Sequence, residues 1–137
     1  MEKPLILMLE CDADDRLITE SSFKERNVNV DIVFKSNSAD FYAWLEGAKS
    51  ATLPSLILLD MNAVPVNARD ILRGLKSSPE FCHIPVVMLS ELTSEKVIRD
   101  CYALGASSFI MKPDSVEQTD KKIMNFISYW FETVALA

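Results

Sequence analysis

The segment PSLILLDMN, residues 54–62, places four bulky aliphatic residues directly before an aspartate. A continuous aliphatic run bounded by turn residues is typical of a strand that is buried on both faces of a sheet. Asp60 ends this run, at the position where open α/β sheets place the groups that face a ligand. An aspartate there also fits a turn or a helix cap, so its role depends on the rest of the chain.

Length and composition predict one domain over residues 1–137, since the chain has 137 residues of which 49% are apolar. The net charge of −6 and the lack of a Lys/Arg cluster argue against a nucleic-acid partner. The longest apolar runs have the length of strands, which argues against a membrane span. The N-terminus lacks the charge pattern and the cleavage site of a signal peptide. Cys11, Cys82 and Cys101 are widely spaced, so we expect reduced thiols and a cytoplasmic protein.

Apolar runs that predict strands alternate with stretches that predict helices. The predicted strands are residues 5–9, 30–34, 56–60, 85–89 and 107–111. The predicted helices are residues 12–27, a segment capped by Ser36 or Asn37, residues 68–76, a segment capped by Thr93 or Ser94, and a segment from about Ser115. Five such units with short connections predict an α/β fold, a flavodoxin-like (βα)5 three-layer sandwich with a parallel sheet of order 2-1-3-4-5.

Apolar side chains at helical spacing predict the faces that cover this sheet. In the first helix, Leu17, Ile18 and Phe23 are candidates for the inward face. We expect Tyr102 to contribute to the core or to helix packing. The acidic pair Asp14-Asp15 opens the first helix, where negative charge suits the helix macrodipole, and is predicted to be structural.

Polar side chains follow the carboxyl ends of four predicted strands and therefore share one edge of the sheet. They are Glu10, Cys11, Asp12, Asp60, Ser90 and Lys112. Because clustered carboxylates repel one another, a site that gathers them commonly holds a hard cation such as Mg²⁺. An aspartate carboxylate is also a nucleophile toward phosphoryl donors. Lys112 and the Ser90 hydroxyl could then bind the phosphoryl oxygens.

The order and spacing of these residues resemble the receiver domain of two-component response regulators. The matching pieces are Glu10 after the first strand, residues 56–62, Ser90 after the fourth strand and residues 109–113. Residues 74–79, 84–90 and 128–131 look like the single-domain regulators that partner bacterial phytochromes and similar kinases. The resemblance covers nearly the whole chain from Leu5.

The resemblance implies a role for each matched residue. Asp60 is the expected phosphoacceptor, Lys112 the phosphate-pairing lysine, and Ser90 the switch hydroxyl, with Phe109 as the switch aromatic. The expected Mg²⁺ ligands are Glu10, Asp60 and the main-chain carbonyl of Asn62, with Asp12 as an alternative ligand. The implied donor of the phosphoryl group is a sensor histidine kinase or a phosphotransfer protein. The protein is then a phosphoacceptor with self-catalysed phosphotransfer and dephosphorylation, and not an enzyme acting on a separate substrate.

Two features depart from the family pattern. Receivers commonly end their first strand with two adjacent acids, whereas this chain has Glu10-Cys11, and a neutral thiol is a poor ligand for Mg²⁺. After Asp60, the chain has Ala63-Val64 and then Ala68 where the family has Met-Pro and a glycine. Both departures make Mg²⁺ affinity the weakest element of the resemblance.

The sequence leaves two function classes open. The first is a single-domain response regulator that is phosphorylated on Asp60 in a phosphorelay. The second is a pseudo-receiver that binds partner proteins without phosphorylation, which Cys11 favours. Either class has protein partners, and a homodimer through the helix from Thr93 and the last helix is one hypothesis. An FMN-binding protein is disfavoured because the loop after the first strand is acidic and would repel a phosphate.

Overall fold

The computed structural model describes residues 3–48, 52–62, 67–91 and 93–137, which form alternating strands and helices. The strands are β1 (Leu5–Leu9), β2 (Asp31–Lys35), β3 (Leu56–Asp60), β4 (Val86–Ser90) and β5 (Ser108–Met111). The helices are α1 (Ala13–Glu25), α2 (Ser38–Ala48), α3 (Ala68–Ser77), α4 (Glu95–Ala103) and α5 (Val116–Glu132).

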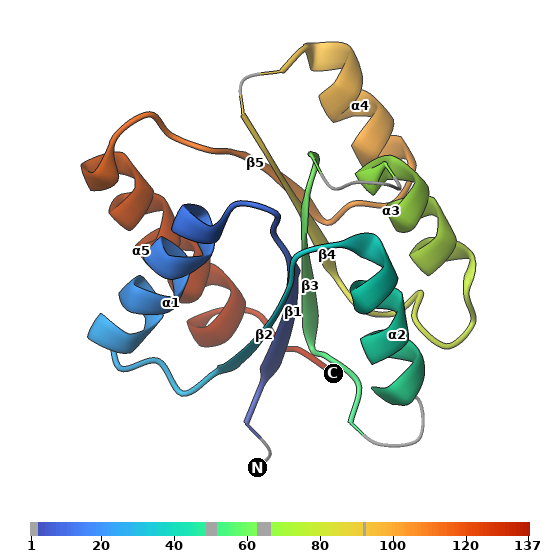
Figure 1. Ribbon diagram of the computed structural model, residues 1–137, viewed down its shortest axis with the longest axis horizontal. Helices are drawn as coiled ribbons and strands as arrows, with labels where there is room; N and C mark the ends of the chain where they lie inside the picture. The colour runs from blue at the N-terminus through green and yellow to red at the C-terminus, as the bar shows by residue number, and fades with distance from the viewer. Residues whose placement is uncertain (1–2, 49–51, 63–66, 92) are drawn as a thin grey trace.

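The strands pair in parallel in the order β2-β1-β3-β4-β5, which confirms the predicted flavodoxin-like sandwich. Helices α1 and α5 cover one face of the sheet, and α2, α3 and α4 cover the other (Figure 1). All five residues of β3 are buried because this strand lies in the centre with helices on both sides. The edge strand β2 is only half-buried.

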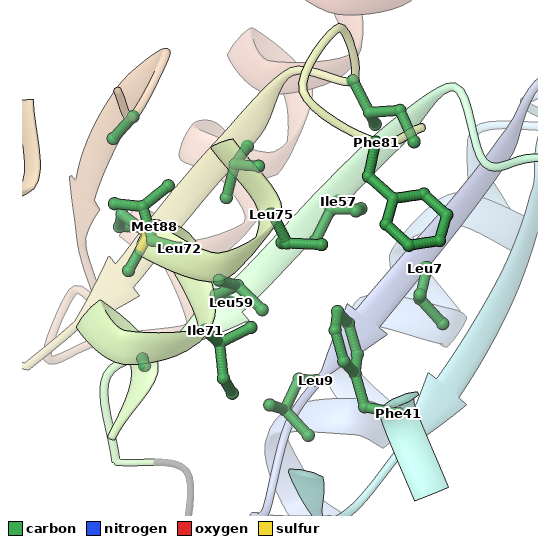
Figure 2. Packing of buried hydrophobic residues seen from close by; sticks show 14 of the residues in the cluster. Leu7, Leu9, Phe41, Ile57, Leu59, Ile71, Leu72, Leu75, Phe81 and Met88 are labelled. Carbon is green, nitrogen blue, oxygen red and sulfur yellow. The ribbon is translucent and has the colours of Figure 1, made fainter. Parts of the chain in front are cut away.

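Alternation along the central strands divides the core into two clusters. Leu7, Leu9, Ile57 and Leu59 pack with α2, α3 and the neighbouring Phe81 on one face (Figure 2). The residues between them point to the opposite face, because successive side chains of a strand alternate. There they pack with α1 and α5 in a second cluster: Ile6, Met8, Leu56, Leu58, Phe126, Ile127 and Trp130.

Local hydrogen bonds decide between the predicted helix caps. The Asp40 backbone N–H donates to Asn37 Oδ1 at 2.8 Å, so Asn37 caps α2. The Ser94 hydroxyl caps α4 by accepting from the Val97 N–H. Gly105 follows α4 with φ of +109°, a conformation that strongly favours glycine and ends the helix.

Three local predictions are wrong in detail. Leu17 is 63% exposed, because the inward stripe of α1 runs through Ile18, Ser22 and Phe23 and leaves Leu17 outside it. Tyr102 is 48% exposed and so lies outside the core, although its hydroxyl accepts a hydrogen bond from the Phe109 N–H. The first helix ends at Glu25 and not at Asn27, which has φ of 56° and so cannot continue the helix.

Some sequence predictions concern residues that are not described. The Ala63-Val64 pair of the loop after Asp60 lies outside the described residues, whereas Ala68 is buried at the start of α3. Within the described ranges, no helix combines the length and the apolar character needed to cross a lipid bilayer.

Candidate functional site

Backbone pairing brings the predicted site residues to one edge of the sheet. The N–H of Glu10 donates to the Lys35 carbonyl at 3.0 Å, which extends the ladder one residue beyond β1. The N–H of Lys112 donates to the Ser90 carbonyl and fixes the exit of β5 beside the end of β4. Asp60 is the last residue of β3, between these two points. The carboxyl ends of β1, β3, β4 and β5 therefore lie around one shared site.

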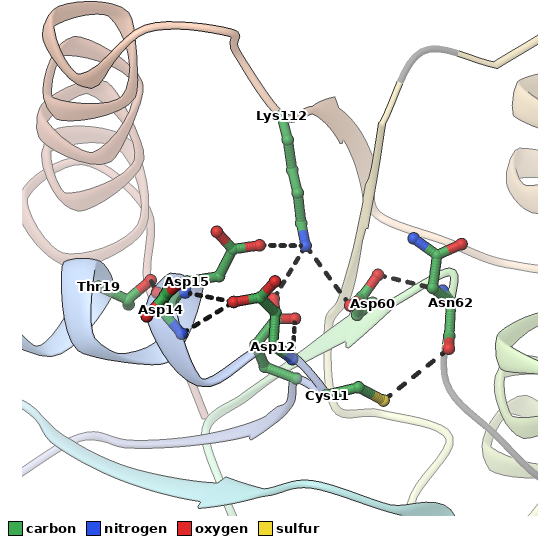
Figure 3. A network of polar contacts seen from close by, with 9 residues as sticks. Cys11, Asp12, Asp14, Asp15, Thr19, Asp60, Asn62 and Lys112 are labelled. Atoms are coloured by element: carbon green, nitrogen blue, oxygen red, sulfur yellow. Dashed lines mark hydrogen bonds and ion pairs between the residues drawn. The ribbon is translucent and has the colours of Figure 1, made fainter.

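The Lys112 ammonium lies among three carboxylates at this site (Figure 3). Its Nζ is 3.0 Å from Glu10 Oε2, 2.9 Å from Asp15 Oδ2 and 3.4 Å from Asp60 Oδ2. The side chains of Glu10 and Asp60 are 0% and 3% exposed, so water screens their charges poorly. Lys112 is therefore the group that makes burial of these two acids tolerable.

Backbone donors hold the remaining oxygens of the two buried acids. The Asp12 N–H donates to Glu10 Oε1 at 3.1 Å, and the Asn62 N–H donates to Asp60 Oδ1 at 3.1 Å. Each acid thus has one oxygen bonded to the backbone and the other facing Lys112. This arrangement fixes the direction of the Asp60 carboxylate before any ligand binds.

Burial and neighbouring charges shift the pKa values of Glu10 and Lys112. Burial, supported by a hydrogen bond with Asp60, raises the pKa of Glu10 from 4.5 to about 7. Burial by itself would lower the pKa of Lys112, but the hydrogen bond with Asp15 and the charge of Glu10 outweigh it. The pKa of Lys112 consequently lies above its ordinary value, and the ammonium stays charged at neutral pH.

The other predicted acid, Asp12, acts as a helix cap in this structure. Its Oδ1 accepts hydrogen bonds from the N–H groups of Asp14 at 2.8 Å and Asp15 at 3.1 Å, which caps α1. Cys11 is exposed, and its Sγ lies 3.8 Å from the Asn62 carbonyl oxygen. The thiol therefore stands beside the main-chain oxygen that the sequence predicts as a metal ligand.

The donors at the site suit a hard cation that keeps most of its water. In the part of the chain that the structure describes, no three His, Cys, Asp or Glu side chains form a cluster that could hold a metal ion. The oxygen donors are the carboxylates of Glu10 and Asp60 and the carbonyl of Asn62. Mg²⁺ is commonly bound through one or two carboxylates with several retained waters, so this small set fits it.

The two predicted switch residues lie on the same strands as the site. Ser90 is 7% exposed at the end of β4, next to the exit of β5. Phe109 is half-buried in β5 and packs against the α3 side of the core. Its backbone N–H donates to the Tyr102 hydroxyl at 3.1 Å, which ties β5 to α4. Their switching roles stay predictions.

Asp15 belongs to the site, although the sequence analysis assigned it to the helix macrodipole. Its carboxylate makes the shortest of the three contacts with Lys112. Asp14 and Asp15 both lie in the first turn of α1, so the sequence alone does not tell which of them contacts Lys112. Only the three-dimensional approach of α1 to the end of β5 distinguishes them.

Known proteins with similar sequences and structures agree on one family. No family model matches the chain. The response regulator Rcp1 of Synechocystis is 27% identical over 137 residues, covering 98% of this chain and 92% of Rcp1. The structure of the phosphorylated cyanobacterial phytochrome response regulator RcpA has a TM-score of 0.90 with 26% identity, covering 98% of this chain and 99% of that chain.

The Mn²⁺-bound form of Rcp1 also has a TM-score of 0.90, with 25% identity and coverage of 98% of this chain and 99% of that chain. Among proteins with this fold, the RcpA structure is thus a phosphorylated form and the Rcp1 structure is bound to a divalent metal. Sequence similarity, strand order and the geometry of the strand ends all agree. The chain therefore has the fold of a response regulator receiver domain and is similar in sequence, over nearly its whole length, to the receiver domains of two-component signalling.

Proposed function

We propose that this protein is a single-domain response regulator that accepts a phosphoryl group on Asp60 in a phosphorelay. The observation that carries the proposal is the buried Asp60 carboxylate at the carboxyl edge of β3, 3.4 Å from the Lys112 ammonium. A nucleophile and a phosphate-binding cation at this distance suit phosphoryl transfer, which depends mainly on positioning and charge stabilisation.

Each residue of the site would have its own role in the phosphoryl transfer. An oxygen of Asp60 attacks the phosphorus while the donor's bond to the phosphoryl group breaks, and the product is an aspartyl phosphate. The Asn62 N–H orients the carboxylate by holding Oδ1. Lys112 would pair with one phosphoryl oxygen, and the Ser90 hydroxyl at the same edge would donate to another.

A divalent cation, which we expect to be Mg²⁺, would be held by Glu10, Asp60 and the Asn62 carbonyl. When bound, it offsets the negative charge of the acids and of the incoming phosphoryl oxygens. Cys11 leaves the site one oxygen ligand short of the family pattern, so we expect weak binding. Asp12 is engaged as the cap of α1 and is a poorer candidate than the other three groups.

The expected partners follow from the proposed reaction. The phosphoryl donor is a sensor histidine kinase or a phosphotransfer protein, and output passes through protein contacts, including a homodimer. Asp60 is modified and later regenerated by hydrolysis within the protein itself, so we do not expect activity on a separate substrate. The free cysteines among the described residues are compatible with a reducing cytoplasm, which stays our expected location.

A second candidate is a pseudo-receiver that docks to partners without phosphorylation. The specific observation in its favour is the exposed Cys11 thiol beside the Asn62 carbonyl. In this case the fold and the lysine network would serve only to present a stable docking surface. The two candidates differ in one property, the reactivity of Asp60.

Intact-mass spectrometry after incubation with acetyl phosphate separates them. With Mg²⁺ present, we expect the mass gain of one phosphoryl group in the wild-type protein and none in Asp60→Asn. Omission of Mg²⁺ should reduce the gain. An unchanged mass in the wild-type protein at all Mg²⁺ concentrations would reject the phosphoacceptor and favour the docking module.

A further inference from the structure

The contact between Asp15 and Lys112 has no part in the reaction proposed above. Asp15 comes from the first turn of α1, whereas the other two partners of Lys112 come from the ends of β1 and β3. Its Oδ2 is 2.9 Å from Nζ, closer than Asp60 Oδ2 at 3.4 Å. The Lys112 ammonium therefore lies closer to Asp15 and Glu10 than to Asp60.

The three carboxylates use the whole donor capacity of the ammonium, because a lysine has three N–H donors. Lys112 borders a cavity of about 130 Å³ with a mostly apolar lining that includes Ile18 and Phe126. An ammonium that turned toward these apolar groups would lose its hydrogen bonds. A phosphoryl oxygen can thus gain a hydrogen bond from Lys112 only if one carboxylate gives up its own.

Exposure identifies the carboxylate that is replaced most easily. The side chain of Asp15 is 39% exposed, whereas Glu10 and Asp60 are 0% and 3% exposed. Water can take the place of Lys112 at Asp15, but it cannot reach the two buried acids without opening the site. Release of Asp15 is therefore the least costly way to free a donor of the ammonium.

We propose that Asp15 is a positioning residue that holds the Lys112 ammonium toward α1 and competes for it with a phosphoryl group on Asp60. The inference rests on the proposed phosphorylation of Asp60 and concerns its regulation. The Asp15 carboxylate also repels the phosphoryl oxygens, so competition and repulsion act in the same direction. Phosphorylation would release the first turn of α1 from β5, and loss of Asp15 would strengthen phosphoryl binding.

The test compares Asp15→Asn with Asp14→Asn. Both variants remove one negative charge from the same helical turn. Of these two aspartates, only Asp15 contacts Lys112 in the described part of the chain. The probe is beryllofluoride with Mg²⁺, titrated into each protein and followed through backbone amide signals in NMR spectra. We expect binding to tighten about three- to tenfold in Asp15→Asn. Asp14→Asn should stay within roughly twofold of the wild-type protein, since its charge is screened by solvent.

A second measurement reads the position of Lys112 without any phosphoryl analogue. Acetylation by a limiting amount of acetic anhydride is followed at Lys112 by peptide mass spectrometry, with the exposed Lys121 as internal reference. We expect Lys112 to react about threefold faster or more in Asp15→Asn, because a charge-assisted hydrogen bond is lost, and at an unchanged rate in Asp14→Asn.

The outcomes separate the two proposals. If beryllofluoride binds Asp15→Asn and Asp14→Asn equally well, the competition is rejected while the phosphoacceptor stands. If beryllofluoride binds none of the proteins, the phosphoacceptor itself is rejected, and the acetylation rate still decides whether Asp15 positions Lys112. Equal acetylation of Lys112 in all three proteins would overturn the positioning role.

Discussion

The two sides of the Asp60 site differ in the charge, the burial and the spacing of their polar groups. On the lysine side, defined by Glu10, Asp15, Asp60 and Lys112, charged groups meet at 2.9 to 3.4 Å, and two of them are buried. On the thiol side, defined by Cys11 and the Asn62 carbonyl, an exposed thiol lies 3.8 Å from a main-chain oxygen. Lys112 therefore supplies positive charge to the site from within the fold, and the oxygen donors for a cation are limited to Glu10, Asp60 and the Asn62 carbonyl.

Removal of Lys112 should produce the largest change in stability, because Lys112 is the cation of the lysine side. In Lys112→Met, the Glu10 and Asp60 carboxylates stay buried without their cation. We expect the free energy of unfolding to fall by roughly 3 kcal/mol at pH 8, as for other buried pairs that lose one member. Urea denaturation measures this change, and Lys121→Met removes an exposed lysine from α5 as control. Equal losses in both variants would contradict a special role for Lys112.

Protonation of Glu10 should change the stability of the lysine side with pH. Because the pKa of Glu10 is raised from 4.5 to about 7 on folding, the folded protein binds a proton more tightly than the unfolded chain. In EDTA, stability should therefore fall as pH rises from about 4.5 to about 7, by about 3 kcal/mol at most. Glu10→Gln should flatten this part of the curve. A slope that is the same in both proteins would show that other groups cause it.

Restoration of an acid at position 11 should strengthen the thiol side. In Cys11→Asp, the added carboxylate gives the site a third anionic oxygen ligand. We expect Mg²⁺ affinity to rise about tenfold, equivalent to about 1.4 kcal/mol. Isothermal titration calorimetry measures the affinity, and Cys82→Asp adds the same charge at another exposed position as control. If Cys11→Asp binds Mg²⁺ no better than the wild-type protein, the thiol does not limit the site.

Substitution of Asp12 should have the smallest effect and separates a helix cap from a metal ligand. Asp12→Ala removes the cap of α1 and should lower the free energy of unfolding by about 1 kcal/mol, whereas Asp12→Asn keeps a capping oxygen. Mg²⁺ affinity should change less than about threefold in both, as for a screened surface charge. A much larger loss of Mg²⁺ binding in both variants would make Asp12 a ligand.

The fold could be predicted from the sequence because strand and helix patterns alternate without ambiguity. Four aliphatic residues before Asp60 required a strand buried on both faces, and parallel strands place their carboxyl ends at one edge. Convergence of Glu10, Asp60 and Lys112 follows from this topology alone, and the structure brings them together.

The details that depend on side-chain direction could not be predicted. Asp15 and Asp14 are equivalent in a local pattern, and only the approach of α1 to β5 selects Asp15. Leu17 was predicted to point inward because it is apolar, yet the stripe that faces the sheet passes beside it. Asp12 was a candidate ligand because of its charge, while its place directly before α1 makes it the cap.

The most direct test of the account is the identity of the phosphorylated residue. After incubation with acetyl phosphate and Mg²⁺, borohydride reduces an aspartyl phosphate to homoserine, and peptide mass spectrometry locates the change. We predict conversion at Asp60 in the wild-type protein, with less conversion in Lys112→Met. Conversion at another acid such as Asp12 or Asp15, or at no residue, would contradict the assignment of Asp60 as the phosphoacceptor.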